Sequence, residues 1–523
     1  MQIHTVESPS RQRTPGWSNR FLIAAIVGIL FLTLFPFRFD FQSRLPGNSS
    51  PFLLGSGIKT SGVFDAFLNV LLFVPFGFGL AEKLRERKLS RFSTLLVVWV
   101  AGAVFSYVIE LTQIYIPMRD SGWEDVLTNS AGAVVGFFLF EILGGFTIAL
   151  LSRAESACRS WLTIKRIAVL LPIYFLSWFA FSAALQTKTK LSNWDPDCLL
   201  VVGNDAAGQS PWKGQIQELE IADRAVPSAA ALELTSGQAS AEPLPDWRAE
   251  YRFEGAPPFK DTKEFLPILS WAPSAPASVP PPSDGLVLNG QSWLASNVAV
   301  ADLVADLQKT NQFALHLICA AEATHDGRGH IISISRPPSF VDLTVRQEES
   351  ALVLWFRNPL SVKRAILAWY VPNVFTDTKT RNILYSYDGA NLSLYINGKK
   401  SGRPYRLGPG TALARLLRKV RPAELQGYMD IYYLLVFFPV GIILGMAAQA
   451  QPQPRLLSLW GIVLYFILPA FLLEFILVRI SGRPFSTSTL LLSLSLIVAG
   501  FLWIRSDSAS FGAAPAPQRQ ASP

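Results

Sequence analysis

Two pairs of polar residues with the same spacing lie inside apolar stretches of the sequence. Asp65 and Asn69 are four residues apart, and so are Asp125 and Asn129. Residues four apart lie on one face of an α-helix, so each pair puts a carboxylate and an amide on a single face. Because such groups are costly in hydrocarbon without partners, the two pairs predict a polar site built between helices.

A third stretch adds an acid, an amide and a cation. Glu110 and Gln113 are three apart, and Arg119 follows shortly before the next apolar run. Burying Glu110 as an ion would cost at least ~2.5 kcal/mol, and Arg119 is the nearest counter-ion, with a planar fork that can bridge two carboxylates. Paired carboxylates could also do acid–base chemistry, with Glu110, Asp125 and Asp65 as the candidate catalytic residues.

Each of these residues also has a structural explanation when it is taken alone. Asp65 and Asp125 could cap helices, and the amides could join helices by hydrogen bonds. The group as a whole favours a functional site, because it includes Glu110 and Arg119 and charged groups inside a membrane are rare.

The composition identifies the elements that must position these residues. Of 523 residues, 50% are hydrophobic and 16% are charged, whereas soluble domains carry roughly 25% charged residues. This excludes a single large soluble enzyme, a disordered chain and a disulfide scaffold. We interpret the first apolar run as an uncleaved anchor, because no small-residue cleavage site follows it. About 20 apolar residues cross a bilayer, and eight runs are candidates: 21–37, 64–82, 92–114, 125–150, 166–185, 430–448, 456–478 and 488–505.

Basic residues between the runs predict the orientation. The segments 83–91 and 151–166 are rich in Lys and Arg, and such segments face the cytoplasm. Counting outward from them puts residues 1–20 and the tail 506–523 in the cytoplasm and the insert 186–429 outside. The composition of the tail predicts disorder.

This orientation gives the polar residues a common level at the outer leaflet. Three fall at outer helix ends and three lie one to two turns deeper, roughly 5–10 Å at 1.5 Å per residue. The end positions are Asp65, Gln113 and Asp125, and the deeper ones are Asn69, Glu110 and Asn129.

The motif set resembles the VanZ-like family of bacterial membrane proteins over about residues 20–150. Pro75 with Gly77 in the second run belongs to the set, and so do Gly132 and Gly136, whose small-xxx-small spacing allows close helix approach. The best-known members of the family are associated with low-level resistance to teicoplanin, a lipid-tailed glycopeptide that acts on cell-wall precursors outside the membrane. The resemblance implies a multi-pass protein of the bacterial inner membrane that acts at the cell envelope.

The last three runs repeat part of this motif at a constant offset of 364 residues. The hypothesis is a parallel duplication in which the second half packs against the first and has lost much of its site. Coincidence among common residues of apolar helices is the alternative. The matching residues are Pro439, Gly441, Glu474, Arg483 and Gly500, and the departures are Asn69 to Tyr433, Gln113 to Leu477, Asp125 to Thr489 and Asn129 to Ser493.

The insert between the fifth and sixth runs reads as an all-β domain. Short stretches alternate apolar and polar residues at 313–318, 330–335, 351–356 and 392–396, which is typical of strands. Asp388-Gly389 and Asn397-Gly398 are hairpin-type turns. About a dozen such strands predict a β-sandwich. The fold class is therefore a polytopic α-helical membrane protein with an inserted sandwich outside the membrane.

Parts of this insert resemble the concanavalin A-like, or laminin G-like, sandwich, with a domain over 190–405. The resemblance implies glycan or protein binding, sometimes with calcium. The order of its segments departs from the family, so we expect a circular permutation, in which strands from 199–224 pair with strands from 384–397. The segments that carry the resemblance are 387–389 with 394–398, and 202–205 with 212–216 and 221–225.

Metal and disulfide chemistry are weakly indicated. Asn204 and Asp205 could hold Ca²⁺, although turn formation explains them as well. The histidines of the insert lack the spacing of zinc ligands on one element. Cys198 and Cys319 could pair outside the cell, whereas Cys158 falls on the cytoplasmic side. We therefore expect no resident cofactor.

Three classes of function remain. The first is an envelope factor whose polar cluster binds a lipid-linked glycan or a lipidated glycopeptide, while the sandwich binds envelope polysaccharide or a protein partner. The second is an intramembrane enzyme that uses paired carboxylates on a lipid-linked substrate. The third is a transporter built on the duplication. Nucleotide-binding and common hydrolase motifs are absent from the sequence, and we expect no nucleic-acid partner.

Overall fold

The computed structural model describes residues 17–34, 63–116, 122–238, 243–244, 246–272, 285–322, 327–361, 367–402, 404–417, 427–450 and 458–505. Within these ranges, seven helices are long and apolar enough to cross a membrane. The sequence predicts eight such spans. Its first run forms α1 (Trp17–Leu34), whose apolar stretch Asn19–Leu34 is shorter than the others. The spanning helices are α2 (Val63–Glu86), α3 (Arg91–Gln113), α4 (Trp123–Trp161), α5 (Ile164–Thr187), α9 (Tyr428–Ala450), the continuous α10 (Leu459–Ile462), η3 (Val463–Ile467) and α11 (Leu468–Ser481), and α12 (Thr487–Arg505).

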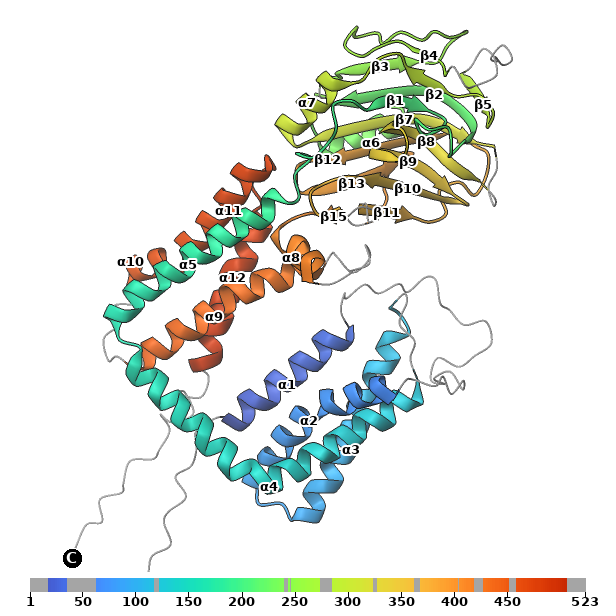
Figure 1. Cartoon of the computed structure of the whole chain (residues 1–523). Coiled ribbons are helices and arrows are strands. Elements are labelled where there is room, and N and C mark those ends of the chain that lie inside the picture. Colours follow the sequence, from blue (N-terminus) through green and yellow to red (C-terminus); the bar gives the residue numbers. More distant parts are fainter. Residues whose placement is uncertain are drawn as a thin grey trace, which may run out of the picture. The chain divides into compact units, whose positions relative to one another are not determined.

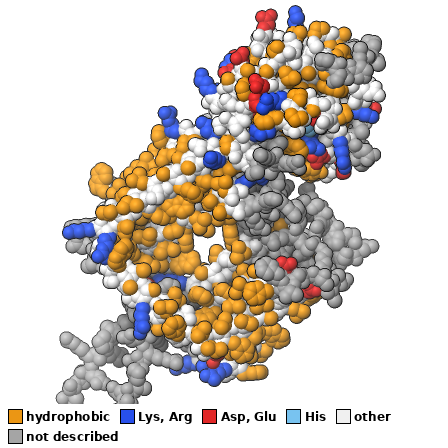
Figure 2. Space-filling view, in the orientation of Figure 1, with side chains coloured by type: hydrophobic (Ala, Val, Ile, Leu, Met, Phe, Trp, Pro, Cys, Tyr) orange, Lys and Arg blue, Asp and Glu red, His pale blue; other side chains and the backbone are white. Residues whose placement is uncertain are grey.

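Helix α4 continues well past the end of its predicted span at residue 150. The segment that follows, up to Trp161, contains Ala, Leu, Arg and Glu and no Gly or Pro, so nothing in it stops a helix. Apolar side chains cover the visible helix surfaces, whereas charged ones are scattered over the β-domain (Figure 2). The N-terminal segment 1–16 and the predicted tail lie outside the described residues.

The first helix set consists of α1 to α4, and its closest packing is between α2 and α4 (Figure 1). A Cβ atom at Gly77 would overlap the carbonyl oxygen of Ala133, and one at Gly136 would overlap that of Val74. Glycine is therefore required where the two backbones touch, as small residues are in tightly packed membrane helices.

The second helix set consists of α5, α9, α10–α11 and α12, and it repeats this contact. A Cβ at Gly441 would overlap the carbonyl oxygen of Ile497, and one at Gly500 would overlap that of Phe438. These four residues lie 364 positions after Gly77, Ala133, Gly136 and Val74 (441 − 77 = 364). Helix α5 joins α9 through the Tyr174 hydroxyl, which donates to the Val436 carbonyl oxygen at 2.8 Å.

The inserted domain is a sandwich of two antiparallel sheets that enclose one apolar core (Figure 1). In the described part of the chain, the first sheet has the order β11 (Leu367–Val371), β10 (Ala351–Phe356), β9 (Phe340–Glu348), β8 (Arg328–Arg336), β1 (Leu199–Val202), β6 (Leu294–Ser296), β4 (Leu269–Trp271). The second has the order β14 (Lys399–Lys400), β13 (Asn391–Ile396), β12 (Arg381–Tyr387), β7 (Phe313–Ala321), β2 (Lys213–Ala222), β3 (Ala249–Arg252), with β15 (Tyr405–Arg406) on β13 and β5 (Leu286–Asn289) on β2.

The sequence predicts the strands of this domain better than their pairing. The four alternating stretches are confirmed as β7, β8, β10 and β13, and both hairpin turns join neighbouring strands. The predicted pairing of 199–224 with 384–397 is wrong. β7 lies between β2 and β12 in the sheet, and β1 pairs with β6 and β8 in the other sheet. The circular permutation that this pairing would have supported has no support in the structure.

The sandwich is seated on the corner between α11 and α12. Asn311 follows helix α7 (Ala301–Thr310) in a left-handed conformation (φ 56°). Its Nδ2 donates to the Ser481 carbonyl oxygen at 2.7 Å, and its Oδ1 accepts from Leu191 N at 3.0 Å. Gln312 Nε2 donates to the Gly482 carbonyl oxygen at 2.7 Å. One short segment therefore ties the sandwich to the end of a membrane-spanning helix.

Candidate functional site

The polar residues of the first helix set meet at the end where α2 and α4 begin and α3 ends. Because glycines bring α2 and α4 together, Asn69 Nδ2 reaches Asp125 Oδ1 at 2.6 Å. The capping explanation for Asp125 is wrong, since Gly122 is the N-cap of α4. Asp125 lies instead in the first turn, where the helix dipole favours a carboxylate.

A second contact lies deeper, between α3 and α4. Asn129 Nδ2 donates to Ser106 Oγ at 2.9 Å, and both residues are buried. Asn129 Oδ1 is also buried and has no hydrogen-bond partner in the part of the chain that the structure describes. Sequence analysis missed Ser106, although it lies four residues before Glu110 and so on the same helix face.

Glu110 and Gln113 fix the end of α3. Glu110 is 2% exposed, and its Oε2 accepts from Gly122 N at 3.1 Å. Gln113 Nε2 donates to the carbonyl oxygen of Thr33 on α1 at 3.0 Å. These contacts hold neighbouring segments together. Arg119 lies outside the described residues.

Exposure falls along the cluster from the helix ends inward. Asp65 is exposed at the start of α2, Asn69 and Asp125 are half-buried, and Asn129 is buried. The exposed Asp65 and the buried Asn129 are therefore the two ends of this gradient of exposure. Near the same end, Tyr107 and Trp123 stack with ring centroids 5.6 Å apart, and such aromatic rings are enriched at membrane–water interfaces.

The corresponding end of the second helix set contains a different constellation. Arg483 is bidentate to Glu474, with Nη1–Oε1 at 2.7 Å and Nη2–Oε2 at 2.6 Å, and both side chains are buried. Ser486 N also donates to Glu474 Oε1 at 2.8 Å, as Gly122 N donates to Glu110, with 486 − 122 = 364. The carboxylate–amide pairs are missing here, because the positions carry Tyr433, Leu477, Thr489 and Ser493.

The predicted calcium candidates of the sandwich form a turn. Asn204 Oδ1 accepts from Asp205 N at 2.9 Å and from Ser210 N at 2.8 Å. Asp205 Oδ1 accepts from Ala207 N at 3.0 Å and from Gln209 N at 2.9 Å. Backbone N–H groups therefore contact Oδ1 of both side chains, as the turn explanation predicts. Cys198 and Cys319 are both buried free thiols.

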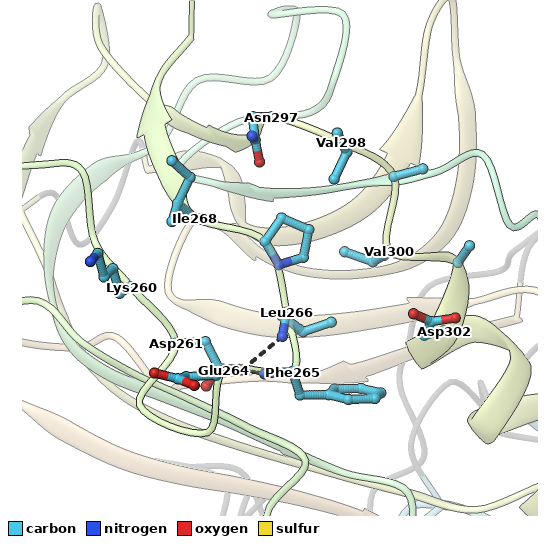
Figure 3. Close-up of a pocket in the computed structure, with 13 residues that line it drawn as sticks. Lys260, Asp261, Glu264, Phe265, Leu266, Ile268, Asn297, Val298, Val300 and Asp302 are labelled. Atoms are coloured by element: carbon cyan, nitrogen blue, oxygen red, sulfur yellow. Dashed lines mark hydrogen bonds between the residues drawn. The ribbon is translucent and has the colours of Figure 1, made fainter.

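A groove of about 570 Å³ lies at one end of the sandwich (Figure 3). Exposed apolar side chains, Ile268 and Val298, line it together with Lys260 and Asp302. The buried Asp261 accepts from the backbone N–H groups of its own loop, including that of Leu266 at 2.8 Å (Figure 3). Its carboxylate stabilises the loop, and we assign no ligand to this groove.

The geometry defines a polytopic membrane protein with a polar interhelical cluster and an inserted β-sandwich. A family model described as VanZ/LLP1 matches residues 21–144, roughly a quarter of the chain and most of the first helix set. The sandwich matches no lectin or laminin G family model. No curated protein and no solved structure matches the chain. The likeness to a known family therefore covers the part that holds the polar cluster.

Proposed function

We propose that this chain is a bacterial cell-envelope protein of the inner membrane. Its polar cluster would bind a lipid-linked glycan or a lipidated glycopeptide at the outer leaflet, and the sandwich would bind envelope glycan or a protein partner outside the membrane. The observation that carries the proposal is the meeting of Asn69, Asp125, Asn129 and Ser106 from three helices at one end of the set.

Charge at the opposite end of the first helix set supports the outer location. Arg85 and Arg91 both approach Glu141 there, at 3.6 and 3.0 Å, and Lys83 and Lys88 lie in or beside the same turn. Basic segments between membrane helices face the cytoplasm, which supports an external location for the cluster.

The chemistry of the cluster favours a ligand that donates hydrogen bonds. Asp65 and Asp125 present carboxylate oxygens, and Asn129 adds a buried carbonyl oxygen that has no hydrogen-bond partner among the described residues. Sugar hydroxyls and peptide N–H groups are donors to such oxygens. A lipid tail on the same ligand would lie along the apolar helix surfaces, which supplies affinity without further polar contacts.

A binding measurement with purified protein in nanodiscs tests the proposal. The probes are a fluorescent lipid-linked glycan and a fluorescent lipidated glycopeptide. Asp125→Asn and Asn129→Leu should each weaken binding about tenfold, the equivalent of 1.4 kcal/mol. Thr489→Val and Ser493→Ala, at the corresponding positions of the second set, are the matched controls and should bind normally.

Two results would count against the proposal. One is unchanged binding of both probes to the Asp125 and Asn129 variants. The other is a Glu110→Gln variant that binds both probes normally although cells that produce it lose the phenotype that the unaltered protein confers. Product analysis of the same incubations tests the alternative of an intramembrane enzyme, since a chemical change in either probe requires a reaction.

A further inference from the structure

Helix α8 (Pro409–Leu417) joins the sandwich to a membrane-spanning helix. It follows β15 and precedes α9. Its first turn packs on the start of α9, where a Cβ at Gly410 would overlap the Tyr428 carbonyl oxygen and lie within 3 Å of the Tyr432 Cβ. Helix α8 therefore begins beside the first residues of α9.

One face of α8 carries exposed leucines. Leu413, Leu416 and Leu417 are spaced i, i+3, i+4 and so share a face. Leu413 is half-buried, and the other two are 62% and 78% exposed. On the other side of the helix, Thr411 is buried, and its Oγ1 donates to the Arg406 carbonyl oxygen at 2.9 Å. The helix thus turns its leucines away from the protein.

This exposure is typical of membrane-facing side chains and differs from that of the sandwich. The most exposed large apolar residue of the described sandwich strands and loops is Val298, at 56%. Values comparable to that of Leu417 occur on the spans, for instance at Ile142, which is 75% exposed. Two neighbouring leucines in water would forgo the ~1.5–3 kcal/mol that burial of each one supplies.

Basic residues accompany the leucines. Arg415 lies in the last turn of α8, and Arg406 lies 3.7 Å from Asp430 at the start of α9. The sequence then continues with Arg418, Lys419 and Arg421 before α9 begins. Leucines on one face with arginine or lysine nearby are typical of helices that lie in the plane of a membrane surface.

We propose that α8 is an interfacial helix that binds the phospholipid bilayer. Its leucine face enters the boundary between head groups and acyl chains, and Arg415 lies at the level of the lipid phosphates. The bilayer is the occupant that fits, because the first turn of α8 packs on the start of α9, a helix long and apolar enough to cross a membrane. The helix then holds the base of the sandwich at the membrane surface, independently of any ligand in the polar cluster.

Spin-label accessibility in the full chain tests this inference. Leu416→Cys and, separately, Leu417→Cys are labelled in a Cys158→Ser background and reconstituted in nanodiscs of phosphatidylcholine and phosphatidylglycerol. Cys198 and Cys319 are buried, and burial raises the pKa of both thiols, that of Cys319 to about 12, so they resist labelling. Ile142→Cys on α4 is the lipid-facing control, and Leu232→Cys on α6 (Ser228–Ser236) in the sandwich is the water-facing control.

The inference predicts that labels at 416 and 417 are reached by oxygen more than by a water-soluble nickel chelate, as at 142. A preference for the nickel chelate, as at 232, would overturn it. Protection from both reagents would overturn it as well, because it would mean that protein covers the leucines. Since neither outcome involves the probes of the polar cluster, failure here leaves the proposed function standing.

Discussion

The two helix sets share a packing scheme and differ in the chemistry at their ends. In both, glycines 364 residues apart bring two helices into backbone contact, and a buried glutamate accepts from the backbone N–H twelve residues later. In the first set the neighbouring positions form carboxylate–amide and amide–hydroxyl contacts. In the second they are aromatic, aliphatic or hydroxyl side chains, and the corner beside them holds the sandwich.

This comparison separates residues that build the helix set from residues that we propose bind a ligand. The glycines and the glutamate occur in both sets, so packing alone explains them. In the first set, the contacts of Asn69 with Asp125 and of Asn129 with Ser106 join different helices. In the second set, Thr489 and Ser493 donate to nearby residues of their own segment. The recurrence of contacts at one offset supports the proposed duplication, and it supports binding as the role of the polar residues that only the first set retains.

The largest effect is expected at the buried ion pair of the second set. Glu474→Leu leaves Arg483 buried without its carboxylate and Ser486 N without its acceptor. Removing one partner of a buried pair costs about 3–5 kcal/mol. Denaturation in detergent micelles should show a loss of this size, while Thr489→Val serves as the control with little change.

The same experiment on the first set tests the duplication. If Arg119 pairs with Glu110 as Arg483 pairs with Glu474, Glu110→Leu should lower the free energy of unfolding by about as much as Glu474→Leu does. A loss of less than about 1 kcal/mol at Glu110 together with a large loss at Glu474 would contradict the equivalence of the two sets.

A smaller and equal effect is expected at the helix crossings. Alanine at Gly77 or at Gly441 would push a Cβ into the backbone of the facing helix, and overpacking of this kind costs about 1–3 kcal/mol. Gly28→Ala and Gly145→Ala are the controls, since nothing lies within 4 Å of a Cβ at either position. We expect thermal unfolding to show the same loss of stability for Gly77→Ala and Gly441→Ala. A difference between them that exceeds the difference between the two controls would contradict the equivalence of the two helix crossings.

Local patterns in the sequence predict the helices and strands. They do not predict the contacts between elements that are far apart in the sequence. Apolar runs and alternating stretches identify helices and strands because their periodicity is a property of neighbouring residues. The partner of β2 is β7, about 100 residues away, and no local signal selects it over β12. Asn311 and Gln312 have no distinctive spacing, so their role at the α11 corner is visible only in the fold. Asn69 and Asp125 were found because polar residues inside apolar runs are conspicuous.

Replacing Asn311 should moderately weaken the contact between the sandwich and the end of α11. Asn311→Gly keeps the left-handed backbone but removes the side chain that joins Leu191 N to the Ser481 carbonyl oxygen. Leaving such buried groups unpaired costs about 1–3 kcal/mol each at most. Hydrogen exchange should rise at residues 481–483 and 191, whereas Asn373→Gly, an exposed position with φ 60°, should leave it unchanged. Unaltered exchange in the Asn311 variant would mean that other contacts hold the seat.

The smallest change in stability is expected when polar residues of the first set are replaced by their counterparts in the second set. This exchange also tests most directly what distinguishes the two sets. The double variant Asp125→Thr, Asn129→Ser gives the first set the side chains that the second set carries at these positions. Hydrogen bonds between membrane helices are worth about 0.6 kcal/mol each, so the two lost contacts should lower the unfolding free energy by about 1 kcal/mol. Binding of the lipid-linked probes should fall at least about tenfold, because the variant changes both side chains whose oxygens we propose as ligand contacts. If stability falls by several kcal/mol while binding by the folded fraction is normal, these residues are structural in the first set too, and its polar cluster has no role that the second set lacks.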